Sequence, residues 1–113
     1  MLKKEFRLRK QRDFENVFNK GFYFYGNFLS LKTVKNGLPV SRFGFIVSKK
    51  ISKKAVERNR VKRLLRESVR LTRNNIRTGF DMIFISKAEI SGKEFKEINL
   101  TVEKLLKKSG LVR

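Results

Sequence analysis

The sequence predicts an α+β fold, a two-layer α/β sandwich in which helices pack on one sheet. Three segments carry apolar residues at helical spacing, and short segments rich in β-branched and aromatic residues lie between them. The expected order of elements is α-β-β-β-α-β-α. At 113 residues, the chain fits one domain, which we expect to span residues 1–113 and to bury one modest core.

The first helix is expected from Asp13 to Lys20. Phe14, Val17 and Phe18 fall at i, i+3 and i+4 and therefore share one face, and Gly21 follows as a stop signal. Aromatic residues at this spacing on a short helix are usually part of a core. Spacing alone therefore favours a packing role for Phe14 and Phe18.

Three segments of the first half are candidate strands. Residues 28–34 and 42–48 have the alternating pattern of a strand with two unlike faces. The aromatic run 22–25 is expected to form an irregular edge of the sheet. A turn separates the two longer strands, because Asn36-Gly37 accepts a positive φ angle and Pro39 fixes its own φ.

The second half is expected to contain the longest helix, a buried strand and a final helix. The long helix runs from about Lys54 to Asn74. Its apolar stripe consists of Val61, Leu64, Leu65 and Val69. Residues 80–86 form an apolar run that is too short for most helices and rich in Ile and Phe, which indicates a buried strand. The segment 91–94, Ser-Gly-Lys-Glu, is typical of a capping box that opens the last helix, and Gly110 closes this helix.

The charge of the chain points to a polyanionic partner. Lys and Arg number 29 and Asp and Glu number 10, which gives a formal net charge of +19. Such a charge repels itself in a folded monomer, and binding to nucleic acid relieves this repulsion. Eleven Phe and two Tyr exclude a disordered basic tail, because such tails are poor in aromatic residues.

The residue types that are absent argue against chemistry on the protein itself. The chain has no Cys and no His, so thiolate nucleophiles, disulfides and the commonest zinc ligands are missing. The two aspartates, Asp13 and Asp81, are far apart in the sequence, whereas a metallonuclease needs clustered carboxylates. We therefore expect no catalytic residue, no metal site and no small-molecule substrate in this chain.

Hydropathy argues against a membrane protein. No apolar run approaches the roughly 20 residues that a membrane span requires. Residues 1–7 have no apolar segment after their charges, which argues against a signal peptide. We expect a cytoplasmic protein without a membrane partner.

Almost half of the excess charge lies on the long helix and the segment before it. Residues 49–73 contain eleven basic and two acidic residues, a net +9. At roughly 100° per residue, several of the cations fall in one arc opposite the apolar stripe. This arc contains Asn59, Lys62, Arg63, Arg66, Arg70 and Arg73. Solvated helix faces usually mix charges of both signs, so this arc favours phosphate binding.

Several motifs resemble those of one family. Residues 53–67, KKAVERNRVKRLLRE, resemble the "RNR" signature of the bacterial ribonuclease P protein family, with Arg58-Asn59-Arg60 as its core. Other stretches are similar to that family in the same order along nearly the whole chain. They are residues 6–9 (FRLR), 13–21 (DFENVFNKG), 44–50 (GFIVSKK) and 79–81 (GFD).

The resemblance implies a function and one detail of the fold. The family's protein binds the ribonuclease P RNA and assists removal of 5′ leaders from precursor tRNA. Its RNA subunit carries the active site and the Mg²⁺ ions, which agrees with the missing catalytic residues here. In the fold that the resemblance implies, the long helix makes a left-handed β-α-β crossover, against the usual handedness.

The resemblance also implies two binding surfaces. The first surface, facing the RNA subunit, would consist of Lys53, Arg58, Asn59, Arg60, Lys62, Arg63 and Arg66. The second would be a cleft for the single-stranded leader, with Phe14 and Phe18 as its aromatic floor, Lys49 beside it and Leu31 at the strand position that faces it. Stacking on aromatic rings tolerates any base.

Three other functions remain open at this point. A ribosomal or general structural RNA-binding protein would share the charge and the fold type. A protein-only nuclease is opposed by the missing His and the scattered carboxylates. Sequence-specific DNA binding is the weakest alternative, because no helix-turn-helix spacing stands out.

Overall fold

A four-stranded sheet organises the structure, a computed structural model that describes residues 2–112. Three α-helices and three short 3₁₀ segments accompany the strands in the described part of the chain. The main elements are α1 (Gln11–Lys20), β1 (Phe22–Phe24), β2 (Leu29–Lys35), β3 (Arg42–Ile46), α2 (Ala55–Thr72), β4 (Phe80–Ser86) and α3 (Phe95–Lys108). The 3₁₀ segments are Lys4–Phe6, Arg73–Asn75 and Ala88–Ile90. The predicted order α-β-β-β-α-β-α is confirmed.

The strands lie in the order β1-β2-β4-β3. β1 pairs antiparallel with β2, and β2 pairs antiparallel with β4. β4 also pairs in parallel with β3, so α2 forms the crossover between two parallel neighbours. The left-handed sense of this crossover stays a prediction.

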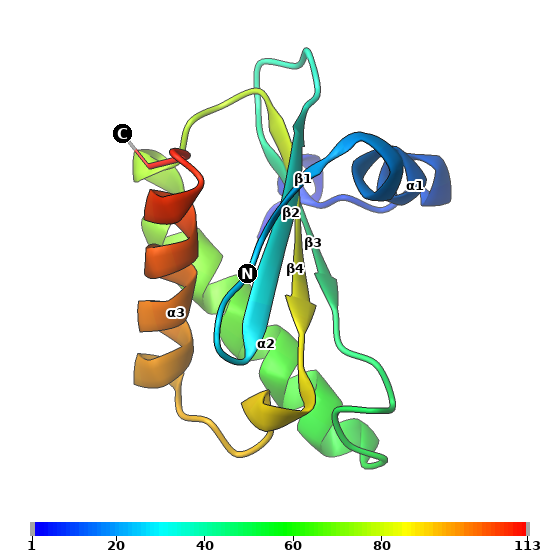
Figure 1. The fold of residues 1–113 in the computed structure, drawn as a ribbon, viewed down its shortest axis with the longest axis vertical. Coiled ribbons are helices and arrows are strands. Elements are labelled where there is room, and N and C mark those ends of the chain that lie inside the picture. The colour runs from blue at the N-terminus through cyan, green and yellow to red at the C-terminus, as the bar shows by residue number, and fades with distance from the viewer. Residues whose placement is uncertain (1, 113) are drawn as a thin grey trace.

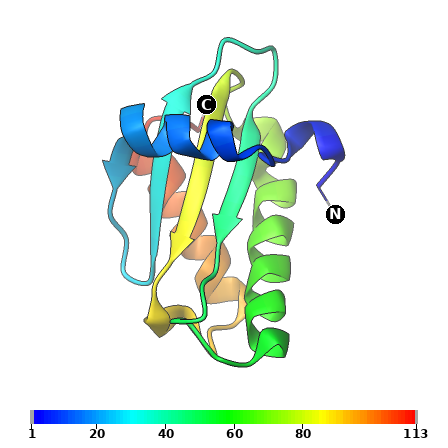
Figure 2. The same ribbon diagram turned by 90° about the vertical axis from the view of Figure 1, so that its right-hand side faces the viewer.

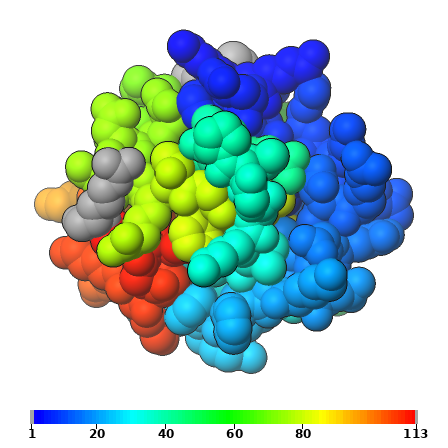
Figure 3. Space-filling model, turned by 90° about the horizontal axis from the view of Figure 1, so that it is seen from above, coloured from blue at the N-terminus to red at the C-terminus, as the bar shows by residue number. Residues whose placement is uncertain are grey.

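The two faces of the sheet carry different helices. α2 and α3 lie side by side on one face and form with the sheet the predicted two-layer sandwich (Figure 1). The short helix α1 lies on the opposite face, where it crosses the strands (Figure 2). Seen from above, the turn between β2 and β3 lies between the blue N-terminal segments and the red end of α3 (Figure 3).

The main core fills the space between the sheet and the helices α2 and α3. The predicted stripe of α2 contributes to it, with Val61, Leu65 and Val69 fully buried and Leu64 partly buried. On the other face, a small separate cluster joins α1 to the sheet. It consists of Leu8, Val17 and Ile83. The core therefore ties the two long helices to the sheet and leaves α1 more lightly held.

The predicted start of the last helix is wrong by three residues. Ser91 was expected to cap the helix, but Gly92 has a φ angle of +81°, which does not fit a helix. The capping box forms instead between Glu94 and Glu97, where the backbone N–H of Glu94 donates to Glu97 Oε2 at 3.0 Å. At its other end, α3 stops at Lys108, and Gly110, the predicted stop signal, follows two residues later with a φ angle of +75°.

Other predicted bounds are close to the observed ones. β4 covers the predicted residues 80–86, and α1 begins two residues before the predicted start. β3 ends at Ile46 rather than at Ser48, because Ser48 begins a turn in which its carbonyl accepts from the N–H of Ile51 at 3.0 Å. Within residues 2–112, none of the helices combines the length and the apolar character needed to span a bilayer.

Candidate RNA-binding surfaces

Phe14 lies directly on the sheet because a glycine stands beneath it. A Cβ atom at Gly44 would come within 2.7 Å of Cζ of Phe14, closer than such atoms approach. The glycine therefore lets the ring settle against β3, next to Leu8 of the small cluster. Phe14 is half-buried, so its ring both packs and reaches the surface.

Phe18, one turn further along α1, is more exposed. Its side chain is 39% accessible. Lys32 of β2 donates a hydrogen bond to the carbonyl oxygen of Phe18, and its Nζ atom lies 5.5 Å from the centre of the Phe18 ring. Leu31, which was expected to face this surface, is fully buried in the main core on the other side. The expectation for Leu31 is wrong because side chains alternate along β2, so Lys32 takes that place.

A groove at the outer edge of β3, where Arg7 bridges to Phe43, is lined by residues of both predicted surfaces. On one side it is bounded by Phe14 of α1 and on the other by Lys62 and Arg66 of α2. Its remaining lining residues are Arg7, Leu8, Arg9, Phe43, Gly44 and Phe45. The groove thus combines a half-exposed ring with cations from two segments, the chain before α1 and helix α2, an arrangement that fits a stacked base and its phosphates.

A partly buried network of ion pairs around Arg42 links α1 to the sheet. The guanidinium of Arg42 donates to both carboxylate oxygens of Asp81, from Nε at 2.9 Å and from Nη2 at 2.7 Å. Asp81 is only 2% exposed and also accepts from Asn36 Nδ2 at 2.9 Å. Arg42 donates in addition to Asp13 of α1 at 3.3 Å. The hydrogen bonds to Asp81 and, less strongly, the charges of Asp81 and Asp13 raise the pKa of Arg42, so its guanidinium stays charged.

Two arginines of the RNR segment are engaged within the protein. Arg60 donates to Glu57 from Nε at 2.7 Å and from Nη2 at 3.1 Å, and also to the carbonyl of Lys93 at 3.1 Å. Glu57 accepts in turn from the N–H of Gly92 at 2.8 Å. The hydrogen bonds from Arg60 and Gly92 lower the pKa of Glu57 to about 2. This Glu57–Arg60 clamp fastens the start of α2 to the loop before α3.

Arg58 is held in a similar way at the preceding turn. Its Nη1 atom donates to the carbonyl oxygen of Ser52 at 2.8 Å, which braces the segment that leads into α2. Arg58 and Arg60 are therefore both held by groups of the protein at the start of α2.

The other predicted binding residues, which are Asn59 and five cations, lie on the surface at different places. Asn59 and Arg63 are exposed, whereas Lys62 and Arg66 are half-buried where they line the groove. Lys49 and Lys53 are exposed in the segment between β3 and α2. Lys49 lies beyond the end of β3, whereas Phe14 covers Gly44 in the middle of that strand. The structure thus brings Phe14 together with Lys62 and Arg66, and it does not bring Lys49 to the same groove.

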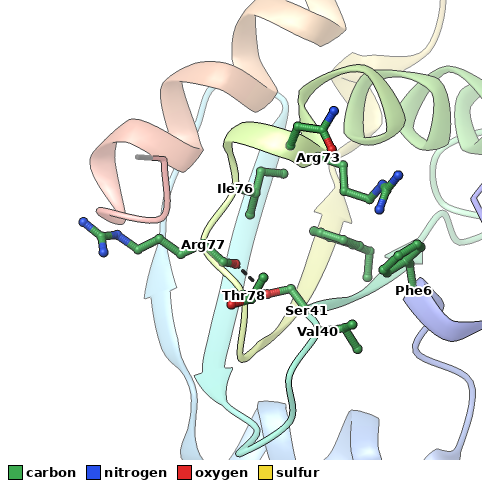
Figure 4. Close-up of a pocket in the computed structure, with 9 residues that line it drawn as sticks. Phe6, Val40, Ser41, Arg73, Ile76, Arg77 and Thr78 are labelled. Atoms are coloured by element: carbon green, nitrogen blue, oxygen red, sulfur yellow. Dashed lines mark hydrogen bonds between the residues drawn. The ribbon is translucent and has the colours of Figure 1, made fainter.

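The last two cations of the predicted arc have partners in the protein. Arg70 donates to both carboxylate oxygens of Glu67 one turn earlier. Arg73 lies over the ring of Phe6, with 4.2 Å between the guanidinium carbon and the ring centre, at the mouth of a pocket by the end of α2 (Figure 4). In the same view, the hydroxyl of Ser41 donates to the carbonyl of Arg77 at 2.6 Å. Both contacts lie within the protein, and the Arg70–Glu67 pair stays exposed to solvent.

The described residues do not form a metal site. No three side chains of the Asp, Glu, His or Cys type gather within residues 2–112 in a way that could hold an ion. The most buried carboxylate, Asp81, is already occupied by Arg42 and Asn36. The carboxylates of residues 2–112 therefore offer no cluster that fits a resident Mg²⁺ ion.

Two residues of these surfaces were missed from the sequence. Gly44 carried a usable signal, because a glycine inside a strand pattern often marks the close approach of another group. The signal for Lys32 was weaker. Strand alternation places Lys32 and Leu31 on different faces of the sheet, but no local pattern shows that α1 covers the face of Lys32. Both were missed because they depend on where α1 docks.

These features define a class of protein: a small, strongly basic α+β protein with a cationic helix and an aromatic helix that meet at one groove. A family model described as Ribonuclease P matches residues 2–110. The chain therefore belongs to the ribonuclease P protein family, and it is a protein subunit of the ribonuclease P holoenzyme, which processes tRNA. This membership disfavours a role as a ribosomal or general structural RNA-binding protein.

Curated relatives and solved structures agree with the family. The ribonuclease P protein component of Caldanaerobacter subterraneus subsp. tengcongensis is 42% identical over 111 residues, which cover 98% of this chain and 95% of that protein. The protein component of Clostridium kluyveri is 40% identical and covers 96% and 97%.

Two solved structures share the fold. The RNase P protein of Staphylococcus aureus superimposes with a TM-score of 0.88 at 28% identity, over 96% of this chain and 98% of that one. The protein of Thermotoga maritima gives 0.82 at 33% identity, over 90% and 96%. The predicted fold class is thereby confirmed.

Proposed function

We propose that this chain binds a ribonuclease P RNA in the cytoplasm through α2 and holds the single-stranded 5′ leader of precursor tRNA along α1. The surface toward the RNA subunit consists of Lys53, Arg58, Asn59, Arg60, Lys62, Arg63 and Arg66. Phe14, Phe18 and Lys49 contact the leader. The chain thereby increases the affinity of the holoenzyme for precursor over mature tRNA.

The groove at the edge of β3 is the observation that supports this proposal most. It puts the half-exposed ring of Phe14 next to Lys62 and Arg66 of the cationic helix. A leader that leaves the RNA subunit at α2 would therefore meet the rings of α1 directly. Stacking on Phe14 and Phe18 accepts any base, as an enzyme that acts on many precursors needs.

In the proposed holoenzyme, the RNA subunit catalyses hydrolysis of the phosphodiester. Hydrolysis of a phosphodiester at useful rates calls for bound Mg²⁺ or for an acid and a base at the bond. The carboxylates of the described residues form no cluster for an ion. We therefore assign Mg²⁺ to the RNA subunit and assign binding and positioning to this chain.

Reconstitution tests the proposal. The chain, a bacterial ribonuclease P RNA and a precursor tRNA are combined with Mg²⁺, and cleavage at the mature 5′ end is measured with each macromolecule omitted in turn. Affinities of the holoenzyme for precursor and for mature tRNA are measured in parallel. We expect cleavage to require the RNA and the preference for precursor to require the chain.

Two outcomes would contradict the proposal. Cleavage by the chain and Mg²⁺ without RNA would place the active site on the protein. An equal gain in affinity for precursor and mature tRNA on adding the chain would remove the leader from its binding surface. Sequencing of RNA that copurifies with the chain gives an independent check, and we expect ribonuclease P RNA to dominate it.

A further inference from the structure

Aromatic rings and lysines continue beyond Phe18 to the far edge of the sheet. Tyr23 of β1 pairs in register with Lys32 of β2, and their side chains share the face that α1 covers. Nζ of Lys32 lies 5.5 Å from the centre of the Phe18 ring and 5.9 Å from that of Tyr23. One lysine therefore connects the ring on α1 with the ring on β1.

The next ring follows directly. Tyr25 lies two residues after Tyr23, and the centres of their rings are 4.4 Å apart with 36° between the ring planes. Tyr25 is 66% exposed. Because Tyr23 is also 39% exposed, the two neighbouring rings form one solvent-exposed surface rather than a buried pair.

Lysines from two further elements flank this tyrosine pair. Lys87, which follows β4, places its Nζ atom 5.9 Å from the centre of the Tyr25 ring and donates to the carbonyl of Gly26 at 2.8 Å. Lys108 of α3 donates to the carbonyl of Tyr25 at 3.1 Å. Within residues 2–112, none of Lys32, Lys87 and Lys108 forms a salt bridge. Their charge is therefore not compensated by carboxylates of the described chain.

We propose that Tyr23 and Tyr25, with Lys32 and Lys87, form a second stacking site for single-stranded RNA, which binds leader nucleotides farther from the cleavage site than those at Phe18. The proposal rests on the leader function proposed above. Solvent-exposed rings interleaved with uncompensated cations are what sequence-tolerant binding of single strands requires, because bases stack on the rings and phosphates pair with the amines.

The direction of the strand follows from the course of α1. Phe14, near the start of α1, touches Gly44 of β3, whereas Gly21, just past its end, lies against Thr33 of β2. α1 therefore runs from the α2 side of the sheet toward β1, which lies at the opposite edge (Figure 2). A leader that enters at the groove beside α2 reaches Phe14, then Phe18 and then the tyrosine pair.

Leader length provides the test in the reconstituted holoenzyme. Affinity is measured for mature tRNA and for precursors whose leaders are lengthened one nucleotide at a time. The double variant Tyr23→Leu/Tyr25→Leu removes both rings, whereas Tyr23→Phe/Tyr25→Phe keeps them as a matched control. Leu100→Ala, an exposed apolar change on α3, controls for nonspecific effects.

The expected result is a loss that depends on length. Leucine at both positions should leave mature tRNA and short leaders unchanged and should weaken long leaders by at least about fivefold, the effect of one lost stacking contact. The phenylalanine variant should match the wild type at every length. Phe18→Leu, by contrast, should weaken all but the shortest leaders.

Other results would overturn the inference. If the leucine variant loses nothing at any length, or loses affinity for mature tRNA equally, the tyrosines are not a leader site. If sedimentation shows that the free wild-type chain is a dimer and the leucine variant is a monomer, a second copy covers the pair instead. If Phe18→Leu weakens the binding of leaders and the tyrosine variant does not, the proposed leader function stands and only the second site is rejected. If neither variant weakens the binding of leaders, both the leader function and the second site are rejected.

Discussion

The two faces of the sheet differ in how much apolar surface they bury and in what they leave exposed. Among the described residues, nineteen buried apolar side chains join the sheet to α2 and α3, whereas three join it to α1. The rings on the α1 face, Phe14 and Phe18, stay partly accessible. Apolar burial on the face of α2 and α3 therefore supplies most of the stability of the fold. The rings on the α1 face need not be fully buried for the protein to fold, so they are available for binding.

The largest effect is expected on the helix-covered face. Phe84 in the central strand β4 is fully buried and stacks on Phe45, with 5.9 Å between ring centres. Phe84→Ala should reduce the free energy of unfolding by about 3–5 kcal/mol, because it leaves a large cavity. Urea denaturation of the free protein measures this. A loss below about 1 kcal/mol would mean that the core repacks around the gap and that the faces differ less than proposed.

The second largest loss of stability is expected for the Arg42–Asp81 ion pair, which connects the sheet with α1 through Arg42. Asp81→Ala leaves the half-buried Arg42 without its main partner and should cost about 2–4 kcal/mol. Because Arg42 also bonds Asp13, hydrogen exchange should accelerate in α1 more than in α3. Asp81→Asn, which keeps the shape of the side chain, should leave turnover of the holoenzyme within a few-fold of wild type. A drop of orders of magnitude in a folded variant would instead indicate a catalytic carboxylate.

On the α1 face, a ring should matter for binding rather than for stability. Phe18→Leu removes a ring that is 39% exposed, so unfolding free energy should fall by less than about 1 kcal/mol. Affinity for leader-bearing tRNA should weaken by about 1–3 kcal/mol, with mature tRNA unaffected. Paired dissociation constants and a melting curve decide between the two roles. Equal losses on both ligands would make Phe18 a packing residue.

Within α2, cations on the surface should behave differently from the clamped one. Arg63→Ala and Arg66→Ala should each reduce the slope of log K against log salt by about one unit, since each removes a phosphate contact. Arg60→Ala should change this slope less and lower the melting temperature more, because Arg60 bonds Glu57 and the carbonyl of Lys93. The reverse pattern would show that RNA displaces the Glu57–Arg60 clamp.

The smallest effect is expected on the pH dependence of stability, through the carboxylate of Glu57. The pKa of Glu57 in the folded protein is about 2, below its usual 4.5, so the carboxylate stabilises the fold above pH 4.5. This contribution is lost as the pH falls from 4.5 through 2. Glu57→Gln should therefore lower stability near neutral pH and make it depend less on pH in this range. Denaturation curves at several pH values check this. Parallel curves for both proteins would show that the carboxylate is not held by Arg60.

Local patterns determined most of the fold from the sequence. The apolar periods of α1 and α2 and the short run of β4 suffice to place these elements, because burial and periodicity are properties of neighbouring residues. The start of α3 was misplaced because Ser91 bonds Glu57 of another element and Gly92 takes a positive φ angle. Such a bond across the fold leaves no local pattern.

The candidate site was predictable only where it depends on local spacing along one helix. Helical spacing identified Lys62 and Arg66 as one cationic face and Phe14 and Phe18 as one aromatic face. Spacing could not show that the two faces meet at one groove, nor that Arg60 bonds the carbonyl of Lys93 before α3. These facts depend on the docking of helices against a sheet, and the partner of each side chain lies more than one element away or on the opposite side of a turn.

The strand order has a consequence for biosynthesis. β2 and β3 follow each other in the chain, yet β4 lies between them and is translated about 35 residues after the end of β3. Until residues 80–86 have left the ribosome, β2 has only β1 beside it, β3 lacks its partner strand, and Ile83 is not there to receive α1. The cations of α2 emerge before that moment. The nascent chain therefore displays its charge before its sheet can close, and nearby RNA meets a polycation first and a shaped surface only later.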